Sequence, residues 1–127
     1  MTYLWIALGS ALGGVGRYAV GLWSAAWWGT GFPWGTLIVN VSGSFIIGVF
    51  AAASSHAGPL TLSDDARLFV TVGLCGGFTT FSAFSLQTLN MMEAGAWPAA
   101  ALNVAGSVVL CLVAVWLGAL AAGALAR

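Results

Sequence analysis

The stretch from Gly73 to Ser85 reads G-L-C-G-G-F-T-T-F-S-A-F-S and places adjacent glycines, hydroxyl side chains and two phenylalanines inside an apolar region of membrane-spanning length. Gly76 and Gly77, followed by the β-branched Thr79 and Thr80, are poor residues for a helix interior. The sequence therefore predicts a helix that is broken in mid-membrane, near residues 76–80, into two half-helices. Because the hydrocarbon core holds no water, a broken backbone must be buried in protein or line a wet cavity, where its freed carbonyl groups can become ligands. We expect this segment to be a functional site.

The rest of the chain is also strongly apolar. Of its 127 residues, 61% are hydrophobic and only 5% are charged, and the mean hydropathy is +1.02. A soluble domain of this size would not remain in solution with such a composition, which predicts an integral, multi-pass protein of the cell membrane. Since about 20 apolar residues cross a bilayer, four crossings with short loops use the whole length. We expect one transmembrane domain over residues 1–127.

Four membrane-spanning segments, and hence an all-α fold, are predicted from the apolar runs. They cover approximately residues 3–23, 35–53, 66–92 and 97–123, and the third is the broken one. The run G-G-V-G-R from Gly13 to Arg17 is predicted to interrupt the first segment. A tryptophan cluster where that segment ends is typical of an aromatic belt at a membrane surface. The cluster consists of Trp23, Trp27, Trp28 and Trp34.

The few charges balance to a formal net charge of zero. This excludes a basic surface for nucleic acid and a polybasic lipid anchor. If both termini lie in the cytoplasm, Arg67 and Arg127 lie inside and Arg17 lies towards the outside, so the positive-inside rule gives almost no preferred orientation. Copies inserted in opposite orientations could then pair as an antiparallel, dual-topology homodimer. Tags on the C-terminus that appear on only one side of the membrane would contradict this hypothesis.

Two function classes lack the residues that they require. Arg17 is the only ionisable residue near the middle of a predicted segment, whereas a proton-coupled exporter needs a titratable group within the membrane. A proton-coupled small-solute exporter is therefore the weaker alternative. No nucleophile and base pair, metal-ligating cluster or phosphate-binding loop is visible, so we expect no enzyme. A helical assembly protein without transport is a third possibility.

Neutral polar side chains and aromatic rings remain as candidates for chemistry. Two phenylalanines lie three residues apart on one helical face, and a polar stripe with a spacing of four runs along the fourth segment. Amide N–H, hydroxyl and ring-edge groups present partial positive charge to an anion without a fixed charge to trap it. Singly, each residue also fits ordinary helix packing, but together with a broken helix they favour a narrow anion pathway. The residues are Asn40, Phe81, Phe84, Asn103, Ser107 and Cys111.

Three runs, in this order along the chain, resemble the fluoride channel family called Fluc or CrcB. They are G-G-V-G-R at residues 13–17, G-T-L-I-V-N-V-S-G-S-F at residues 35–45, and the run at residues 73–85. The resemblance implies an antiparallel, dual-topology homodimer that passively exports fluoride through two pores and so reduces fluoride toxicity. Fluoride, the lipid bilayer and a second copy of the chain would be its partners.

The resemblance also implies roles for individual residues. Phe81 and Phe84 would be the phenyl groups along the pores, and Asn40 would be a hydrogen-bond donor beside them. The backbone carbonyl groups of Gly76 and Thr79 from each chain would hold a structural, untransported sodium ion at the dimer centre, since oxygen ligands suit a hard cation.

Three further residues are placed near the path by the same resemblance. Arg17 would either attract anions in an aqueous vestibule or have a structural role at a helix end. Thr36 and Ser44 would be polar residues near the path.

Three positions differ from what the resemblance leads us to expect. Asn103 and Cys111 stand where family members often carry a tyrosine and a serine, and Gln87 stands where a glutamate is frequent. An amide still donates a hydrogen bond, whereas a thiol donates more weakly than a hydroxyl. These differences affect the detail of the pore.

Overall fold

The computed structural model describes residues 1–55 and 60–125, and all regular secondary structure in that part of the chain is helical. Arg127, which contributes to the predicted charge bias, lies outside the described residues. The all-α prediction is confirmed. The elements are α1 (Thr2–Trp28), α2 (Trp34–Ala53), α3 (Asp64–Leu68), the π-helix η1 (Phe69–Cys75), α4 (Gly76–Phe78), α5 (Phe81–Glu93) and α6 (Trp97–Leu125).

Three stretches of the described chain are long and apolar enough to cross a membrane. They are residues 34–53, residues 64–93 and residues 97–124. The 27 residues of α1 would span about 40 Å at the helical rise of about 1.5 Å per residue, but its glycines and Arg17 make it less apolar. The four predicted segments correspond to α1, α2, the α3–α5 stack and α6.

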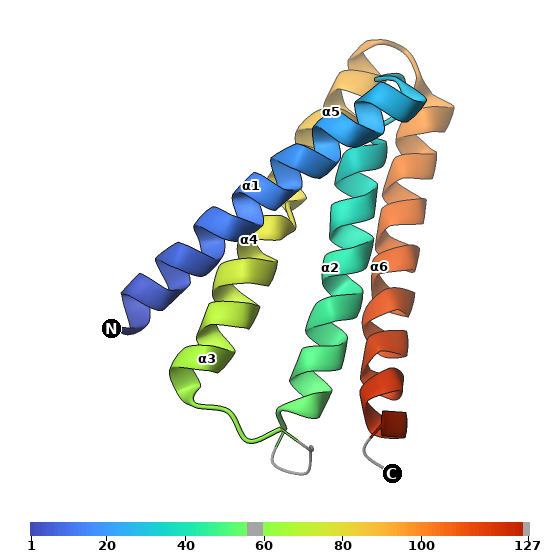
Figure 1. Cartoon of the computed structure of the whole chain (residues 1–127). Coiled ribbons are helices and arrows are strands. Elements are labelled where there is room, and N and C mark those ends of the chain that lie inside the picture. The colour runs from blue at the N-terminus through green and yellow to red at the C-terminus, as the bar shows by residue number, and fades with distance from the viewer. Residues whose placement is uncertain (56–59, 126–127) are drawn as a thin grey trace.

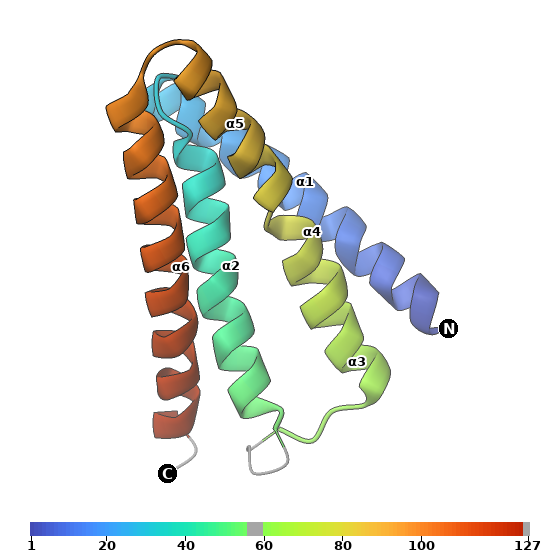
Figure 2. The same ribbon diagram turned by 180° about the vertical axis from the view of Figure 1, so that it is seen from behind.

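The helices form two groups that meet at one end of the molecule. Figures 1 and 2 show α2 and α6 running side by side, while α1 crosses the α3–η1–α4 stack. Small residues let the backbones of α2 and α6 touch: a methyl group added at Gly48 would collide with the Val115 carbonyl, and one at Gly118 with the Phe45 carbonyl. Such close approach is the usual basis of helix packing in membranes, where apolar burial gives little driving force.

The predicted interruption of the first segment is wrong, because α1 continues without a break through Gly13 and Arg17. The glycines there serve packing instead. A Cβ atom at Gly13 would lie 2.7 Å from the backbone nitrogen of Phe78, and one at Gly77 would lie 2.8 Å from the Cα atom of Ser10. The missing side chains therefore allow the backbones of α1 and α4 to touch.

The third segment is broken as predicted, but at the threonines rather than at the glycines. Gly76 and Gly77 are helical, whereas Thr79 (φ −85°, ψ 158°) and Thr80 (φ −155°, ψ 114°) are extended. The helix before the break includes a π-helical turn, a form that is frequent at functional sites. After the break, the Thr80 hydroxyl accepts a hydrogen bond from the Ala83 N–H at 3.1 Å and so caps α5.

The predicted aromatic cluster is present at the turn between α1 and α2. Trp23 and Trp28 contact edge to face with ring centroids 5.2 Å apart, and Trp28 lies 6.1 Å from Trp34. All three indole groups are at least 41% exposed. Their position at one end of the molecule agrees with a membrane-surface belt.

Candidate functional site

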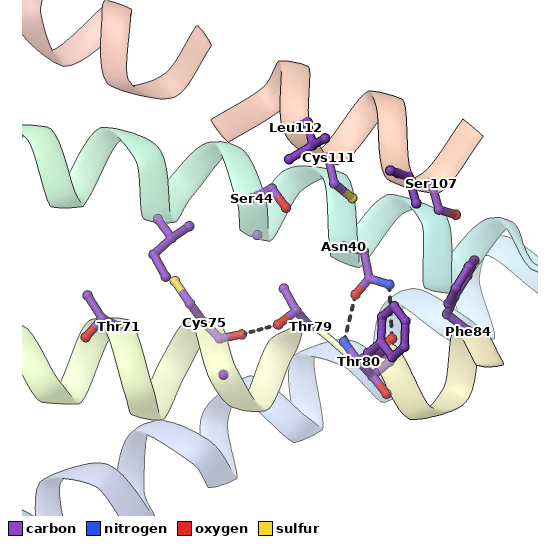
Figure 3. A pocket seen from close by; sticks show the side chains of 15 residues that line it. Asn40, Ser44, Thr71, Cys75, Thr79, Thr80, Phe84, Ser107, Cys111 and Leu112 are labelled. Carbon is purple, nitrogen blue, oxygen red and sulfur yellow. Dashed lines mark hydrogen bonds between the residues drawn. The ribbon is translucent and has the colours of Figure 1, made fainter. Parts of the chain in front are cut away.

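A cavity of about 420 Å³ lies beside the helix break, between α2, the third segment and α6. Figure 3 shows the hydroxyl of Ser44 and the thiol of Cys111 on the sides of α2 and α6 that face the break. The structure therefore brings together most of the residues predicted from the sequence. Those that line this cavity are Asn40, Ser44, Gly76, Thr79, Phe81, Phe84, Ser107 and Cys111.

Asn40 is joined to the break by two hydrogen bonds. Its Nδ2 atom donates to the Thr80 carbonyl at 3.0 Å, and the Thr80 N–H donates to Asn40 Oδ1 at 2.7 Å. This pairing satisfies the Thr80 N–H, which the break separates from its helical acceptor within the membrane, and adds a second donor to the Thr80 carbonyl at the N-cap of α5. Because a primary amide carries two N–H bonds, one donor of Asn40 remains for a further partner.

The break also leaves a carbonyl group available. In an unbroken α-helix the Thr80 N–H would donate to the Gly76 carbonyl, but here it donates to Asn40. Gly76 is exposed at the open side of the cavity. The Thr79 N–H and hydroxyl both donate to the Cys75 carbonyl at 2.9 Å, so the Thr79 hydroxyl is already engaged. The described residues contain no cluster of three or more His, Cys, Asp or Glu side chains suited to a metal. A cation bound here would need backbone oxygen ligands.

Phe81 and Phe84 lie together at the cavity but differ in exposure. Their ring centroids are 5.2 Å apart, which agrees with the predicted common face. Phe84 is buried, with 7% of its surface exposed, whereas Phe81 is 76% exposed. In a membrane an exposed ring of this kind faces either lipid or another apolar chain.

The polar stripe of α6 is only partly directed at the cavity. Asn103 is 2% exposed, and its Nδ2 atom donates to the Thr88 hydroxyl at 2.9 Å. The Ser107 hydroxyl points to Asn103 Oδ1 at 3.4 Å, and the Thr88 hydroxyl donates to the Phe84 carbonyl at 2.8 Å. Asn103 thus connects α6 to α5 and does not line the cavity. Sequence reasoning missed Thr88, although it follows Phe84 by one helical turn.

Similarity to known proteins agrees with this site. A family model described as "CrcB-like protein, Camphor Resistance (CrcB)" matches residues 4–119. The chain belongs to the CrcB family. The predicted family is therefore confirmed, and a CrcB protein with three apolar membrane-spanning stretches is a multi-pass membrane protein.

Three curated relatives of this CrcB protein carry the name "Fluoride-specific ion channel FluC". The relative from Opitutus terrae is 58% identical over 120 residues, which cover 94% of this chain and 91% of the relative. The relative from Methylocella silvestris is 57% identical over 118 residues, 93% of this chain and 90% of its own. The relative from Paramagnetospirillum magneticum is 53% identical over 122 residues, which cover 96% of this chain and 95% of the relative. The name describes a channel, in agreement with the expectation that the chain is not an enzyme.

Arg17 and Thr36 line a different cavity of the CrcB chain. This space of about 500 Å³ also contacts Gly14, Thr80 and Ala83. Thr80 lines both this cavity and the one beside the break. The two predicted residues therefore lie on the other side of the break from Ser44 and Cys111.

Gln87 lines a third cavity, of about 410 Å³, which also contacts Ser24, Thr36 and Asn90. Its Oε1 atom is buried and has no hydrogen-bond partner among the residues that the structure describes. A buried amide oxygen is unfavourable unless water or another donor reaches it.

Proposed function

We propose that this CrcB protein is a fluoride-selective channel that passively exports fluoride and so lowers its toxicity to the cell. The observation that carries the proposal is the cavity beside the helix break that Asn40 holds in place. The described lining of this cavity contains neutral donors and two phenyl rings, and no Asp, Glu, His, Lys or Arg side chain. Relatives covering more than 90% of this chain are named fluoride-specific channels, which supports the same conclusion.

The chemistry of the lining suits a small, strongly hydrated anion. The second N–H of Asn40, neighbouring hydroxyl groups and the edges of Phe81 and Phe84 can compensate part of the dehydration of fluoride. No cationic side chain in this lining would hold the ion too tightly to leave. Larger chloride would fit such a narrow path poorly.

The proposal includes an antiparallel homodimer with two pores. Support comes from the open side of the cavity, where Phe81 and Gly76 are exposed, because a second copy would cover both. A structural sodium ion would lie at the dimer centre, held by the carbonyl groups of Gly76 and Thr79 from each chain. It would be coordinated by the Gly76 oxygen that the break leaves without its helical donor. Equal labelling of C-terminal tags from both sides of the membrane would support dual topology, and labelling from one side would contradict it.

A proton-coupled small-solute exporter is the alternative. It requires a group that alternately binds substrate and proton, and the cavity lining as described offers no carboxylate or imidazole. The exporter would depend on a proton gradient, whereas the channel would not.

The deciding experiment is fluoride efflux from liposomes that contain the purified protein, followed with a fluoride electrode and without a proton gradient. Matched vesicles loaded with chloride are the control. Fast fluoride loss without chloride loss is the expected result. Absence of fluoride loss from folded, dimeric protein would overturn the proposal.

A further inference from the structure

A further cavity adjoins the proposed pathway at the end of the molecule opposite to the α1–α2 turn. It has a volume of about 510 Å³ and is lined by Ala51, Ser54, Asp64, Arg67, Leu68 and Thr71. Thr71 also lines the cavity beside the helix break. The two spaces therefore share a wall and follow one another along the same pair of helices.

Helical spacing places the linings of the two adjoining cavities on the same faces of α2 and of the third segment, and the two cavities together are called the groove. On α2 the lining residues Asn40, Ser44, Ile47, Ala51 and Ser54 are spaced by three or four positions, so they form one face. The third segment repeats this spacing.

The lining residues of the third segment are Arg67, Thr71, Cys75 and Thr79. Two facing stripes thus extend from the break to the polar end of the fold, where the ribbons of α2 and α3 end (Figures 1 and 2).

Two charged side chains, Arg67 and Asp64, line the outer cavity of the groove. Arg67 is partly buried, and it forms no ion pair within the described part of the chain, although Asp64 lines the same cavity. The Thr71 hydroxyl donates to the Arg67 carbonyl at 2.8 Å, which places the residue shared by both cavities one helical turn from the arginine. A guanidinium group stays protonated at any physiological pH.

A purely local role explains Arg67 poorly. Arginine near a helix C-terminus can stabilise the helix dipole, but α3 continues directly into η1, and the residue that follows it, Phe69, is helical. Arg67 therefore lies in the first turn of a continuing helix that begins at Asp64, and no helix C-terminus is present there for its charge to stabilise.

We propose that the positive charge of Arg67 attracts fluoride to the end of the pathway that lies at α3. Arg17 lies on the other side of the helix break. This inference rests on the proposed channel function. A cation in a cleft raises the local anion concentration and the entry rate, and Arg67 lines the outer cavity but not the neutral cavity beside the break, so it would not trap the ion there. Asp64 acts against it in the same cavity.

The test compares fluoride efflux of the unsubstituted protein with that of R67Q, R67K and D64N at two ionic strengths. The salt is composed of impermeant ions, at about 0.01 M, where the screening length is about 30 Å, and at about 1 M, where it is about 3 Å. Size-exclusion chromatography of each variant checks assembly.

At low salt R67Q is expected to conduct roughly tenfold more slowly, R67K near the unsubstituted rate, and D64N faster. These differences should largely disappear at high salt. An R67Q efflux rate equal to the unsubstituted rate at low salt would overturn the inference. A reduction of R67Q efflux that is the same at both salt concentrations would also overturn it, as would a failure of R67Q to assemble. If the unsubstituted protein itself released no fluoride, the channel proposal would fail and this inference with it. If the unsubstituted protein released fluoride normally and R67Q had no effect on the rate, only the proposed role of Arg67 would be rejected.

Discussion

The side-chain amide of Asn40 on α2 and the backbone of Thr80 at the helix break exchange two hydrogen bonds, of 3.0 and 2.7 Å. The amide oxygen replaces the helical acceptor that the Thr80 N–H lacks, and the pair of bonds fixes the break against α2. It also holds the remaining N–H of Asn40 in one orientation beside the cavity. Asn40 is therefore at once a support for the broken backbone and a candidate ligand of the anion.

Asn40→Asp should block the channel. A carboxylate would lose the donor to the Thr80 carbonyl and would repel both that oxygen and an approaching anion. We expect fluoride efflux from liposomes to fall about tenfold or more, since ~1.4 kcal/mol corresponds to a factor of ten in rate. Ser42→Ala is the matched control, because the Ser42 hydroxyl on the same helix bonds back to the Ile38 carbonyl at 2.6 Å. Full activity of the aspartate variant would remove Asn40 from the path.

Phe81→Ile and Phe84→Ile should each reduce fluoride efflux sharply, because both remove ring edges that we propose to face the ion. Their effects on stability should differ. Phe84 is buried and Phe81 is 76% exposed in the single chain. Only Phe84→Ile is therefore expected to lower the free energy of unfolding, by roughly 1–2 kcal/mol. Phe45→Ile, on the exposed side of α2, serves as the control. Unchanged efflux in both pathway variants would show that the rings take no part in conduction.

Gly13→Ala should destabilise the protein, whereas the neighbouring Gly14→Ala should not. The added methyl group at Gly13 would lie 2.7 Å from the Phe78 nitrogen, while nothing lies within 4 Å of one at Gly14. Forcing α1 away from α4 is expected to cost about 1–3 kcal/mol, measured as a lower melting temperature in detergent. Equal melting temperatures for the two variants would contradict the observed backbone contact.

Thr88 and Asn103 should be coupled in stability. Thr88→Val leaves the buried Asn103 amide without its acceptor at 2.9 Å, and Asn103→Leu removes that amide. In a double-mutant cycle the combined variant should be less destabilised than the sum of the single ones, by about 0.6–1.7 kcal/mol. Simple additivity would mean that the hydrogen bond contributes nothing.

Replacing sodium by a bulky organic cation should weaken the proposed dimer, which size-exclusion chromatography can follow. Thr79→Val should retain this dependence on sodium, because the Thr79 hydroxyl already donates to Cys75 and the proposed ligand is the backbone carbonyl. If dimer content did not change with the cation, the sodium site would be rejected.

Much of the helical organisation could be predicted from the chain alone. Apolar runs of membrane length predict helices because the bilayer excludes unpaired backbone groups, and four helical units are found where four were expected. The break in the third segment was also predictable, since adjacent glycines and threonines disfavour a helix. The run at residues 73–85 further indicated the CrcB family, which residues 4–119 match.

Glycine was misread at two places for one reason. Local propensity makes Gly13 and Gly77 helix breakers, but in the folded chain their lack of a side chain lets α1 approach η1 and α4. Tertiary packing thus keeps both residues helical. The break falls instead at Thr79 and Thr80, where the Asn40 side chain accepts the hydrogen bond of the Thr80 N–H that the break leaves without a helical acceptor.

The amino-acid sequence by itself determined the membrane environment, the helices and the family, because hydropathy, periodicity and local motifs act over short stretches of chain. Only the tertiary structure decided which polar groups meet. Asn103 turns to Thr88 and away from the cavity, Arg17 lies on the other side of the break from Ser44, and Arg67 joins the α2 groove. These relations depend on the crossing of helices distant in sequence, whose positions follow from backbone contacts at glycines rather than from any local preference.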